Sequence, residues 1–357
     1  MAQTLTVLIT GVGSPGAPGV IQSLRTVKDM NFHIIGIDMQ PLVAGAGLAD
    51  QFIQVPKASD PDFIEKLLSI CSGCKVDVVL PLVSGELPVF AQHLTPFHSI
   101  GTEVSVSEYP SLVKAMNKGR LLKFLEAEDF IVPDYKIVQT ADDLLKAIHD
   151  LGYPERPVCF KPAISDGSRG FHVLDAGINR FEFLFNEKPN SAYLSERELI
   201  DVLRNYKSIP ETVVTEFLPG EEYSVDILAD HGHVLAALPR LRQKMVDGIS
   251  VQSKIVKAED VIHYTKTIVE ALKLHGNIGV QVRRDRSGKA KILEINPRIQ
   301  GTIVHCTAAG INLPYLAIKL AKGLPITAED LSVKWGSQMI RYWNEVYFSE
   351  EGQFFLF

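Results

Sequence analysis

Residues 279–301 read GVQVRRDRSGKAKILEINPRIQG and contain a polar hairpin that decides how the rest of the chain is interpreted. Two runs of strand-like residues flank the four-residue turn Asp285–Gly288, which predicts an antiparallel pair with Arg284 opposite Lys289. In that register, odd-numbered positions of the first strand share a face with even-numbered positions of the second. One face then carries Gln281, Ile292, Glu294 and Asn296, and the core face carries Val280, Val282, Leu293 and Ile295.

The polar face of this hairpin offers oxygen ligands for hard cations. The amides of Gln281 and Asn296 and the carboxylate of Glu294 suit Mg²⁺ or Mn²⁺ better than zinc, which prefers nitrogen and sulfur. Pro297 ends the strand, and Arg298 follows with a fork of donors suited to a phosphoryl oxygen. A solvated polar face is the alternative interpretation, and motifs upstream favour the metal site.

Composition sets the class of protein. The 357 residues include 46% hydrophobic and 22% charged residues, which is typical of a globular chain with two or three domains. The formal charge of -6 gives no general attraction to polyanions, so we expect no nucleic-acid partner. The chain begins without a basic, apolar leader and has no segment of membrane-spanning length, which predicts a cytoplasmic protein without a membrane partner.

The first third alternates strands and helices. Strands are expected at residues 6–10, 32–38 and 76–80, with helices at about 19–28 and 62–71 between them. This rhythm predicts a parallel, doubly wound sheet. The turn Gly11–Gly16 matches the G-x-G-x-x-G pattern and the second strand ends in Asp38, so an NAD-dependent oxidoreductase is one alternative. Two prolines make this match atypical, and close helix-to-strand packing explains the glycines equally well.

The remaining chain changes character twice. A single helix is expected at about 109–127, and the next segments predict a small α+β subdomain with short strands and two helices. Longer strands follow at 213–217, 223–229 and 233–239, and a helix at about 261–275 precedes the hairpin.

Two motifs in this part carry groups suited to a nucleotide. Lys161 ends a strand that leads into a loop rich in glycine and serine, whose backbone N–H groups can close on anionic oxygens. Backbone groups at residues 216–218 could read an adenine edge, and Glu222 could accept from ribose hydroxyls. An ordinary hairpin tip and an ordinary tight turn are the alternatives.

The order of these motifs resembles the ATP-grasp superfamily. The ordered set is Asn117-Lys-Gly-Arg, Phe160-Lys-Pro with the following glycine loop, Glu216-Phe-Leu-Pro-Gly-x-Glu, Gln281 and Glu294-x-Asn-Pro-x-Arg. The likeness is greatest to the large chain of carbamoyl phosphate synthase and to single-module carboxylate-amine ligases, and it covers nearly the whole chain. It implies a Rossmann-like pre-ATP-grasp domain at residues 1–112 and the two-subdomain ATP-grasp fold at 113–357, with a small lid at about 133–214 and a catalytic subdomain at about 215–357.

The resemblance also implies roles for individual residues. Lys118 and Lys161 would contact ATP phosphates, beneath a lid loop that includes Ser165, Gly167, Ser168 and Gly170. Glu216, Phe217 and Leu218 would form the adenine hinge, and Glu222 would hold the ribose. Gln281, Glu294 and Asn296 would ligate two Mg²⁺ or Mn²⁺ ions, and Arg298 would hold the transferred phosphoryl group.

The function implied is an ATP-dependent carboxylate-amine, or carboxylate-thiol, ligase. It would act through an acyl phosphate on a small amino-acid-like substrate, release ADP and phosphate, and form a homodimer as similar enzymes do. The segment Asp247–Ser250 lacks the histidine of the carbamoyl phosphate synthase pattern, which argues against bicarbonate. Arg240, Arg242 and Lys244 could instead receive an organic carboxylate, with Arg240 a candidate catalytic residue, and Glu86 could meet the amine or order the N-terminal sheet. A carbamoyl phosphate synthase-like enzyme and an ATP-binding module without catalysis remain alternatives.

Overall fold

The computed structural model describes residues 4–165, 167, 169–186, 192–246, 248–350 and 354–355. The chain forms two compact units, which are described separately. The first comprises Met1–Ala115, Glu222–Gln281 and Ile295–Phe357, and the second comprises Met116–Glu221 and Val282–Glu294. The tip of the 279–301 hairpin belongs to the second unit, while its base belongs to the first.

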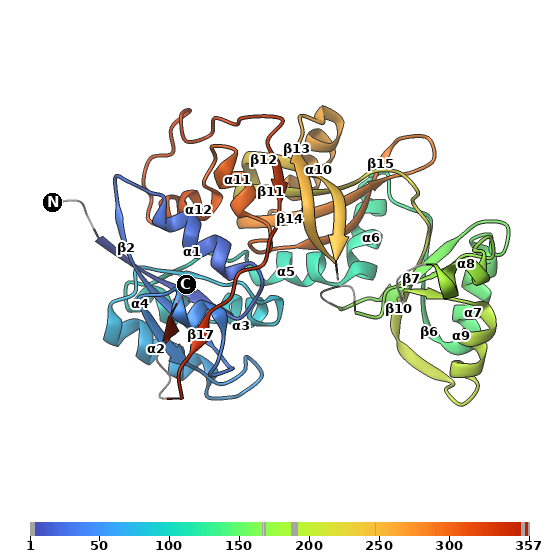
Figure 1. Cartoon of the computed structure of the whole chain (residues 1–357), viewed down its shortest axis with the longest axis horizontal. Helices are drawn as coiled ribbons and strands as arrows, with labels where there is room; N and C mark the ends of the chain where they lie inside the picture. Colours follow the sequence, from blue (N-terminus) through green and yellow to red (C-terminus); the bar gives the residue numbers. More distant parts are fainter. Residues whose placement is uncertain are drawn as a thin grey trace. The chain divides into compact units, whose positions relative to one another are not determined.

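The first unit contains a five-stranded parallel sheet (Figure 1, blue). Its order is β3 (Gln51–Gln54), β2 (Asn31–Asp38), β1 (Thr4–Thr10), β4 (Val78–Leu80) and β5 (Glu103–Val104), and every neighbouring pair is parallel. The accompanying helices are α1 (Ala17–Arg25), α2 (Phe63–Cys74), α3 (Leu87–Gln92), α4 (Leu94–Ser99) and α5 (Tyr109–Met116), with 3₁₀ turns η1 (Ala44–Gly47) and η2 (Ser84–Glu86). The predicted parallel sheet is confirmed, and apolar residues of β1 and α1 share one core.

Glycines at the end of β1 allow close packing. Gly13 N–H donates to Asp38 Oδ2 at 2.8 Å, which closes the turn on the end of β2. A Cβ at Gly16 would lie 2.7 Å from Cα of Gly301, and one at Gly19 would lie 3.0 Å from Cβ of Val304. The first turn of α1 is therefore packed against protein, which favours the packing interpretation of this glycine pattern over dinucleotide binding.

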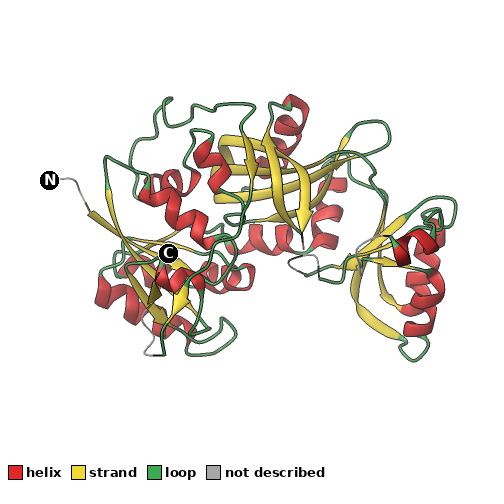
Figure 2. Ribbon diagram, viewed as in Figure 1, coloured by secondary structure: helices red, strands yellow, loops and turns green. Residues whose placement is uncertain are grey.

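A six-stranded sheet contains the hairpin (Figure 2). Its order is β15 (Ala290–Asn296), β14 (Gly276–Arg284), β11 (Glu222–Asp230), β12 (His233–Val246), β13 (Ile249–Ile255) and β16 (Gln338–Ile340). Helices α10 (Glu259–Ala271), α11 (Val304–Ala308) and α12 (Leu313–Ala321) and the short pair β17 (Tyr347–Phe348) and β18 (Phe354–Phe355) complete this unit. No helix among the described residues has both the length and the apolar composition needed to cross a membrane.

The strand expected at 233–239 proved too short. β12 continues to Val246 and pairs with β13, where Val246 lies opposite Ile249. Gly248 has a φ of 76°, as a tight turn of this kind requires. The segment compared with carbamoyl phosphate synthase therefore falls on a β-hairpin turn, although Asp247 itself lies outside the described residues.

The second unit combines a five-stranded sheet with helices (Figure 1, largely green). Its sheet has the order β6 (Tyr135–Thr140), β10 (Ser208–Glu216), β7 (Val158–Pro162), β8 (His172–Leu174) and β9 (Tyr193–Leu194). Its helices are α6 (Lys118–Ala127), α7 (Ala141–Asp150), α8 (Arg180–Phe185) and α9 (Glu196–Leu203). Apolar side chains of α7 and α9 pack with those of the central strands β7 and β10 to form its core.

The single helix expected at 109–127 is wrong, because Asn117 divides it. Asn117 is extended, with φ -96° and ψ 110°, and its side chain accepts the N–H of Arg120 as the N-cap of α6. The Asn117 amide also donates to Glu211 Oε1 at 3.0 Å, and Lys118 N–H donates to Ala163 O at 2.9 Å. Lys118 thereby becomes the first residue of a helix, where backbone N–H groups already favour anions.

The hairpin register differs by one residue from the prediction. Asp285 N–H donates to Lys289 O at 2.9 Å, so Asp285 rather than Arg284 faces Lys289. The Asp285 carboxylate accepts the N–H groups of Ser287 and Lys289, which stabilises this turn. Ile292 is buried and Leu293 is only partly buried, the reverse of the expected pattern. Ile292 and Ile295 are both buried although three positions apart, so strict alternation fails between them.

Candidate functional site

Three of the predicted site residues meet in the second unit. Lys118 Nζ lies 3.6 Å and Lys161 Nζ 3.9 Å from Glu294 Oε2. Lys118 begins α6, Lys161 lies on β7 and Glu294 lies on β15. The side chains are 6%, 16% and 25% exposed, respectively, so two ammonium groups surround one carboxylate in a partly desolvated environment.

Further hydrogen bonds hold the two ammonium groups. Lys118 Nζ donates to Ser165 O at 2.9 Å and to Ser165 Oγ at 3.3 Å, while Lys161 Nζ donates to Leu293 O at 2.9 Å. The cluster, here called the lysine–glutamate cluster (Lys118, Lys161, Glu294), therefore combines cations suited to phosphate with a carboxylate suited to a hard divalent ion.

The glycine loop follows directly from β7. Gly167 and Gly170 have φ values of 61° and 72°, a conformation that favours glycine. A Cβ at Gly170 would lie 2.8 Å from Cδ of Pro162, so the loop passes close to the end of β7. Ser168 was also predicted to belong to this lid, and it lies outside the described residues.

The predicted adenine hinge is contacted by Lys291, a residue of β15 that the sequence analysis did not select. Glu216 Oε1 accepts from Lys291 Nζ at 2.6 Å and from Asp134 N–H at 3.1 Å. Burial opposes the charge of Lys291, but the hydrogen bond and charge of Glu216 outweigh it and raise the pKa of Lys291. Alternating lysines at the start of β15 were the only sequence signal for this contact.

The two residues that follow Glu216 differ in environment. The Arg283 guanidinium lies over the Phe217 ring, 5.2 Å from its centroid, whereas Leu218 is buried with 3% exposure. The hinge thus joins the end of β10 to the hairpin tip by polar and cation–π contacts.

In the first unit, Arg242 connects two predicted site residues. Its guanidinium is paired with the carboxylate of Glu222, and Nη1 lies 3.4 Å from Gln281 Oε1. Arg242 Nε also donates to Ser250 Oγ at 3.1 Å. The predicted ribose acceptor and one predicted metal ligand therefore share a cation, and Arg242 positions both.

Arg240 occupies a different position from the one expected of a catalytic residue. Its side chain is 1% exposed and is paired with Asp226, which is 2% exposed. Asp226 Oδ1 also accepts from Gln300 Nε2 at 3.1 Å, and Cys306 Sγ donates to Oδ2 at 3.3 Å. Direct contact between Arg240 and a substrate is incompatible with this burial, so we assign Arg240 to a buried network, here called the arginine–aspartate network (Arg240, Asp226, Gln300, Cys306).

Arg298 reaches the carboxyl end of the parallel sheet. Its Nε donates to Ser84 Oγ at 3.0 Å, and Nη1 donates to Ile299 O at 2.9 Å. Asn296, two residues earlier, is partly exposed at the end of β15. The first unit therefore presents Asn296 and Arg298 on one short segment that leaves the sheet.

Glu86 lies near the same edge. Its carboxylate accepts the hydroxyl of Thr10, which in turn accepts Leu82 N–H at 3.0 Å. Burial raises the pKa of Glu86 to about 7, and the charge of Asp38 adds to this shift. Ligands of parallel sheets bind outside the carboxyl ends of strands, which is where Glu86 lies.

Two segments of the chain match known sequence families. Residues 208–344 match the family model "ATP-grasp in the biosynthetic pathway with Ter operon", and residues 7–105 match "PylC-like, N-terminal domain".

Solved structures show the same fold over almost the whole chain. An N5-carboxyaminoimidazole ribonucleotide synthetase in complex with ADP is 19% identical, with a TM-score of 0.66 and coverage of 93% of this chain and 79% of that one. An L-amino acid ligase from Bacillus licheniformis is 16% identical (TM-score 0.63, coverage 91% and 76%). A biotin carboxylase from Campylobacter jejuni is 17% identical (TM-score 0.66, coverage 93% and 74%). The chain therefore has the fold of these enzymes, and its residues 208–344 match an ATP-grasp family model.

Proposed function

We propose that this protein joins the carboxylate of a small, amino-acid-like substrate to an amine, or to a thiol, at the expense of ATP. The reaction would proceed through an acyl phosphate and release ADP and phosphate. The observation that carries the proposal is the lysine–glutamate cluster, in which the ammonium groups of two lysines from separate motifs each lie within 4.0 Å of the Glu294 carboxylate.

Charge explains why such a cluster suits the reaction. A substrate carboxylate must approach the γ-phosphate of ATP although both are anions. Lys118 and Lys161 would offset that repulsion and remain as hydrogen-bond donors while charge spreads over the phosphoryl oxygens. Their present partner, Glu294, would turn from the lysines toward a cation once phosphates engage the ammonium groups.

The residues fit a hard divalent metal. Gln281, Glu294 and Asn296 offer only oxygen when they bind a metal, which matches Mg²⁺ or Mn²⁺. When bound, such an ion would neutralise phosphate charge and align the β- and γ-phosphates for transfer. We propose these three residues as its ligands and Glu294 as the one shared by two ions.

The proposed reaction has two steps, phosphorylation of the carboxylate and attack by the amine. A carboxylate oxygen forms a bond to the γ-phosphorus, and the bond from that phosphorus to the β-bridging oxygen breaks, so ADP leaves. The amine nitrogen then bonds to the acyl carbon, the carbon–oxygen bond to phosphate breaks, and the amine loses a proton to solvent. Arg298 would hold the phosphoryl group in both steps, and the loop at 165–170 would exclude water from the acyl phosphate.

Release of ADP across a panel of amino-acid pairs tests the activity. We expect release that requires ATP, Mg²⁺ and both substrates, and its loss in Glu294→Ala. Glu103→Ala, which removes an exposed carboxylate paired with His98, is the matched control and should retain the rate. Binding of ATP without ADP release for any pair would favour a binding module instead.

An isotope experiment tests the acyl phosphate itself. With ¹⁸O in the substrate carboxylate, one labelled oxygen should appear in the released phosphate, because the carbon–oxygen bond breaks after phosphorylation. Label in AMP, or none in phosphate, would contradict this route.

Comparing the affinities for NADH and ATP addresses the oxidoreductase alternative. Binding of NADH without binding of ATP would reject the proposal.

A further inference from the structure

The turn between β11 and β12 is unusual in composition. Asp230 pairs with His233, and the two residues between them, His231 and Gly232, have φ values of 44° and 94°. Positive φ at both positions defines a type I′ turn, in which Asn-Gly is the preferred pair. His231 therefore has a backbone conformation that asparagine adopts with less strain.

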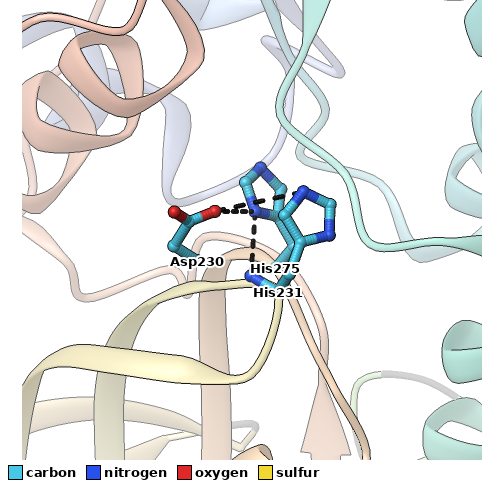
Figure 3. A group of neighbouring side chains, drawn as sticks. All are labelled: Asp230, His231 and His275. Atoms are coloured by element: carbon cyan, nitrogen blue, oxygen red, sulfur yellow. Dashed lines mark hydrogen bonds and ion pairs between the residues drawn. The ribbon is translucent and has the colours of Figure 1, made fainter.

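His231 and its neighbours form a compact group of metal-ligand types. Asp230 Oδ1 lies 3.4 Å from His275 Nδ1 and 3.9 Å from His231 Nε2. The two imidazole rings stack with centroids 4.3 Å apart, and Figure 3 shows one nitrogen of each ring joined to the Asp230 carboxylate. One ligand atom from each residue lies within 4.8 Å of the others. Glu108 Oε1 adds a second carboxylate oxygen 3.8 Å from His231 Nδ1.

Backbone contacts fix these residues although they come from distant parts of the chain. Ser107 Oγ accepts His275 N–H at 2.8 Å and donates to His275 O at 3.0 Å. Gly232 N–H donates to Leu274 O at 2.8 Å, which ties the hairpin turn to the loop between α10 and β14. A Cβ at Gly232 would lie 3.2 Å from Glu270 O, so this approach requires glycine. The backbone segments that carry His231 and His275 are thus held together by the fold, which limits the movement needed to bind a metal ion.

We propose that Asp230, His231 and His275 bind a late first-row transition-metal ion, with Zn²⁺ as the expected occupant. Two imidazole nitrogens and one carboxylate oxygen match the ligands of zinc, whose tetrahedral geometry sets ligand atoms roughly 3.3–3.5 Å apart. The separations of 3.4 and 3.9 Å are close to this range. Binding would replace one weak contact, the 3.3 Å donation from His231 N–H to His275 Nδ1.

This site differs in chemistry from the oxygen ligands proposed for Mg²⁺, and it does not depend on the proposed function. A bound ion would link the β11–β12 turn to the α10–β14 loop. It would therefore stabilise this unit rather than take part in group transfer.

Titration of the metal-free, full-length protein tests the proposal. We expect one Zn²⁺ per chain by calorimetry, and Co²⁺ should develop the intense visible absorption of a tetrahedral site. His231→Asn retains a residue that the turn favours and should weaken Zn²⁺ binding at least about tenfold. His275→Ala should do the same, and a thermal melt of each variant confirms that it is folded.

The matched control is His149→Ala, which removes another imidazole paired with a carboxylate, 2.6 Å from Glu196. It should leave Zn²⁺ affinity unchanged. The proposal is overturned if the wild-type protein binds no Zn²⁺, if folded His231→Asn binds it as tightly as the wild type, or if Mg²⁺ displaces it at equal concentration.

Discussion

The lysine–glutamate cluster and the arginine–aspartate network hold a carboxylate in opposite ways. Glu294 is 25% exposed and lies 3.6 and 3.9 Å from two ammonium groups. Asp226 is 2% exposed, touches Arg240 directly, and is bonded to Gln300 and Cys306 as well. Both pair an acid with a base, yet they differ in what a ligand can reach.

Pairing distance and exposure therefore distinguish a carboxylate that a ligand can reach from one that stabilises the fold. A loosely paired, partly exposed carboxylate can exchange lysine for a cation with little loss, because water shares the change in charge. A buried pair cannot release either partner without leaving an uncompensated charge.

Breaking the arginine–aspartate network should have the largest effect. Asp226→Ala would leave Arg240 charged and buried, and we expect a loss of about 3–5 kcal/mol in the free energy of unfolding. Urea denaturation measures it. The double variant Asp226→Leu/Arg240→Met should recover most of this loss, and equal instability of the single and double variants would contradict the assignment.

Breaking the lysine–glutamate cluster should instead reduce activity while preserving the fold. Lys161→Met is expected to lower the rate of ADP release about 10²–10³-fold, because it removes a donor to the transferred phosphoryl group. The free energy of unfolding should change by no more than about 1 kcal/mol. Lys146→Met, on the exposed side of α7, is the control, and a similar rate loss in it would undermine the comparison.

Glu86 extends the comparison to the pH dependence of the free energy of unfolding. Burial raises its pKa to about 7 from an ordinary 4.5, so the folded protein binds a proton that the unfolded chain releases. Its contribution to stability is complete below pH 4.5 and is lost as the pH rises through about 7. Denaturation between pH 5 and 8 should show this decline in the wild type and a smaller one in Glu86→Gln. An unchanged slope in the variant would assign the effect elsewhere.

The smallest effect is expected at the surface. His149 and Glu196 form an exposed pair in the second unit, and His149→Ala should change the free energy of unfolding by about 1 kcal/mol or less. ADP release should be unaffected. A decrease of more than about 2 kcal/mol in the free energy of unfolding would show that exposure alone does not determine how much each pair stabilises the fold.

Sequence patterns anticipated the elements whose burial is regular. Runs such as β1 and β2 alternate with amphipathic helices, and this periodicity predicted the parallel sheet. The motif order also grouped Lys118, Lys161 and Glu294, which the structure brings together, while their roles stay a prediction.

The misses arise from contacts that are distant in sequence. The break at Asn117 depends on a bond to Glu211, and an apolar pattern running through both helices concealed it. The burial of Arg240 depends on its pairing with Asp226 in the neighbouring strand, which no local pattern indicates. Nothing in the local sequence links His275 to His231, because they meet through contacts between the β11–β12 turn and the α10–β14 loop.

The division of the hairpin has a consequence for protein engineering. The chain enters and leaves the second unit at residues 115/116, 221/222, 281/282 and 294/295. A contiguous fragment spanning 116–221 would therefore omit Lys291 and Glu294, so Glu216, Lys118 and Lys161 would lose these counter-ions. To exchange the second unit between related proteins, residues 282–294 must be transferred together with residues 116–221, as two separate segments.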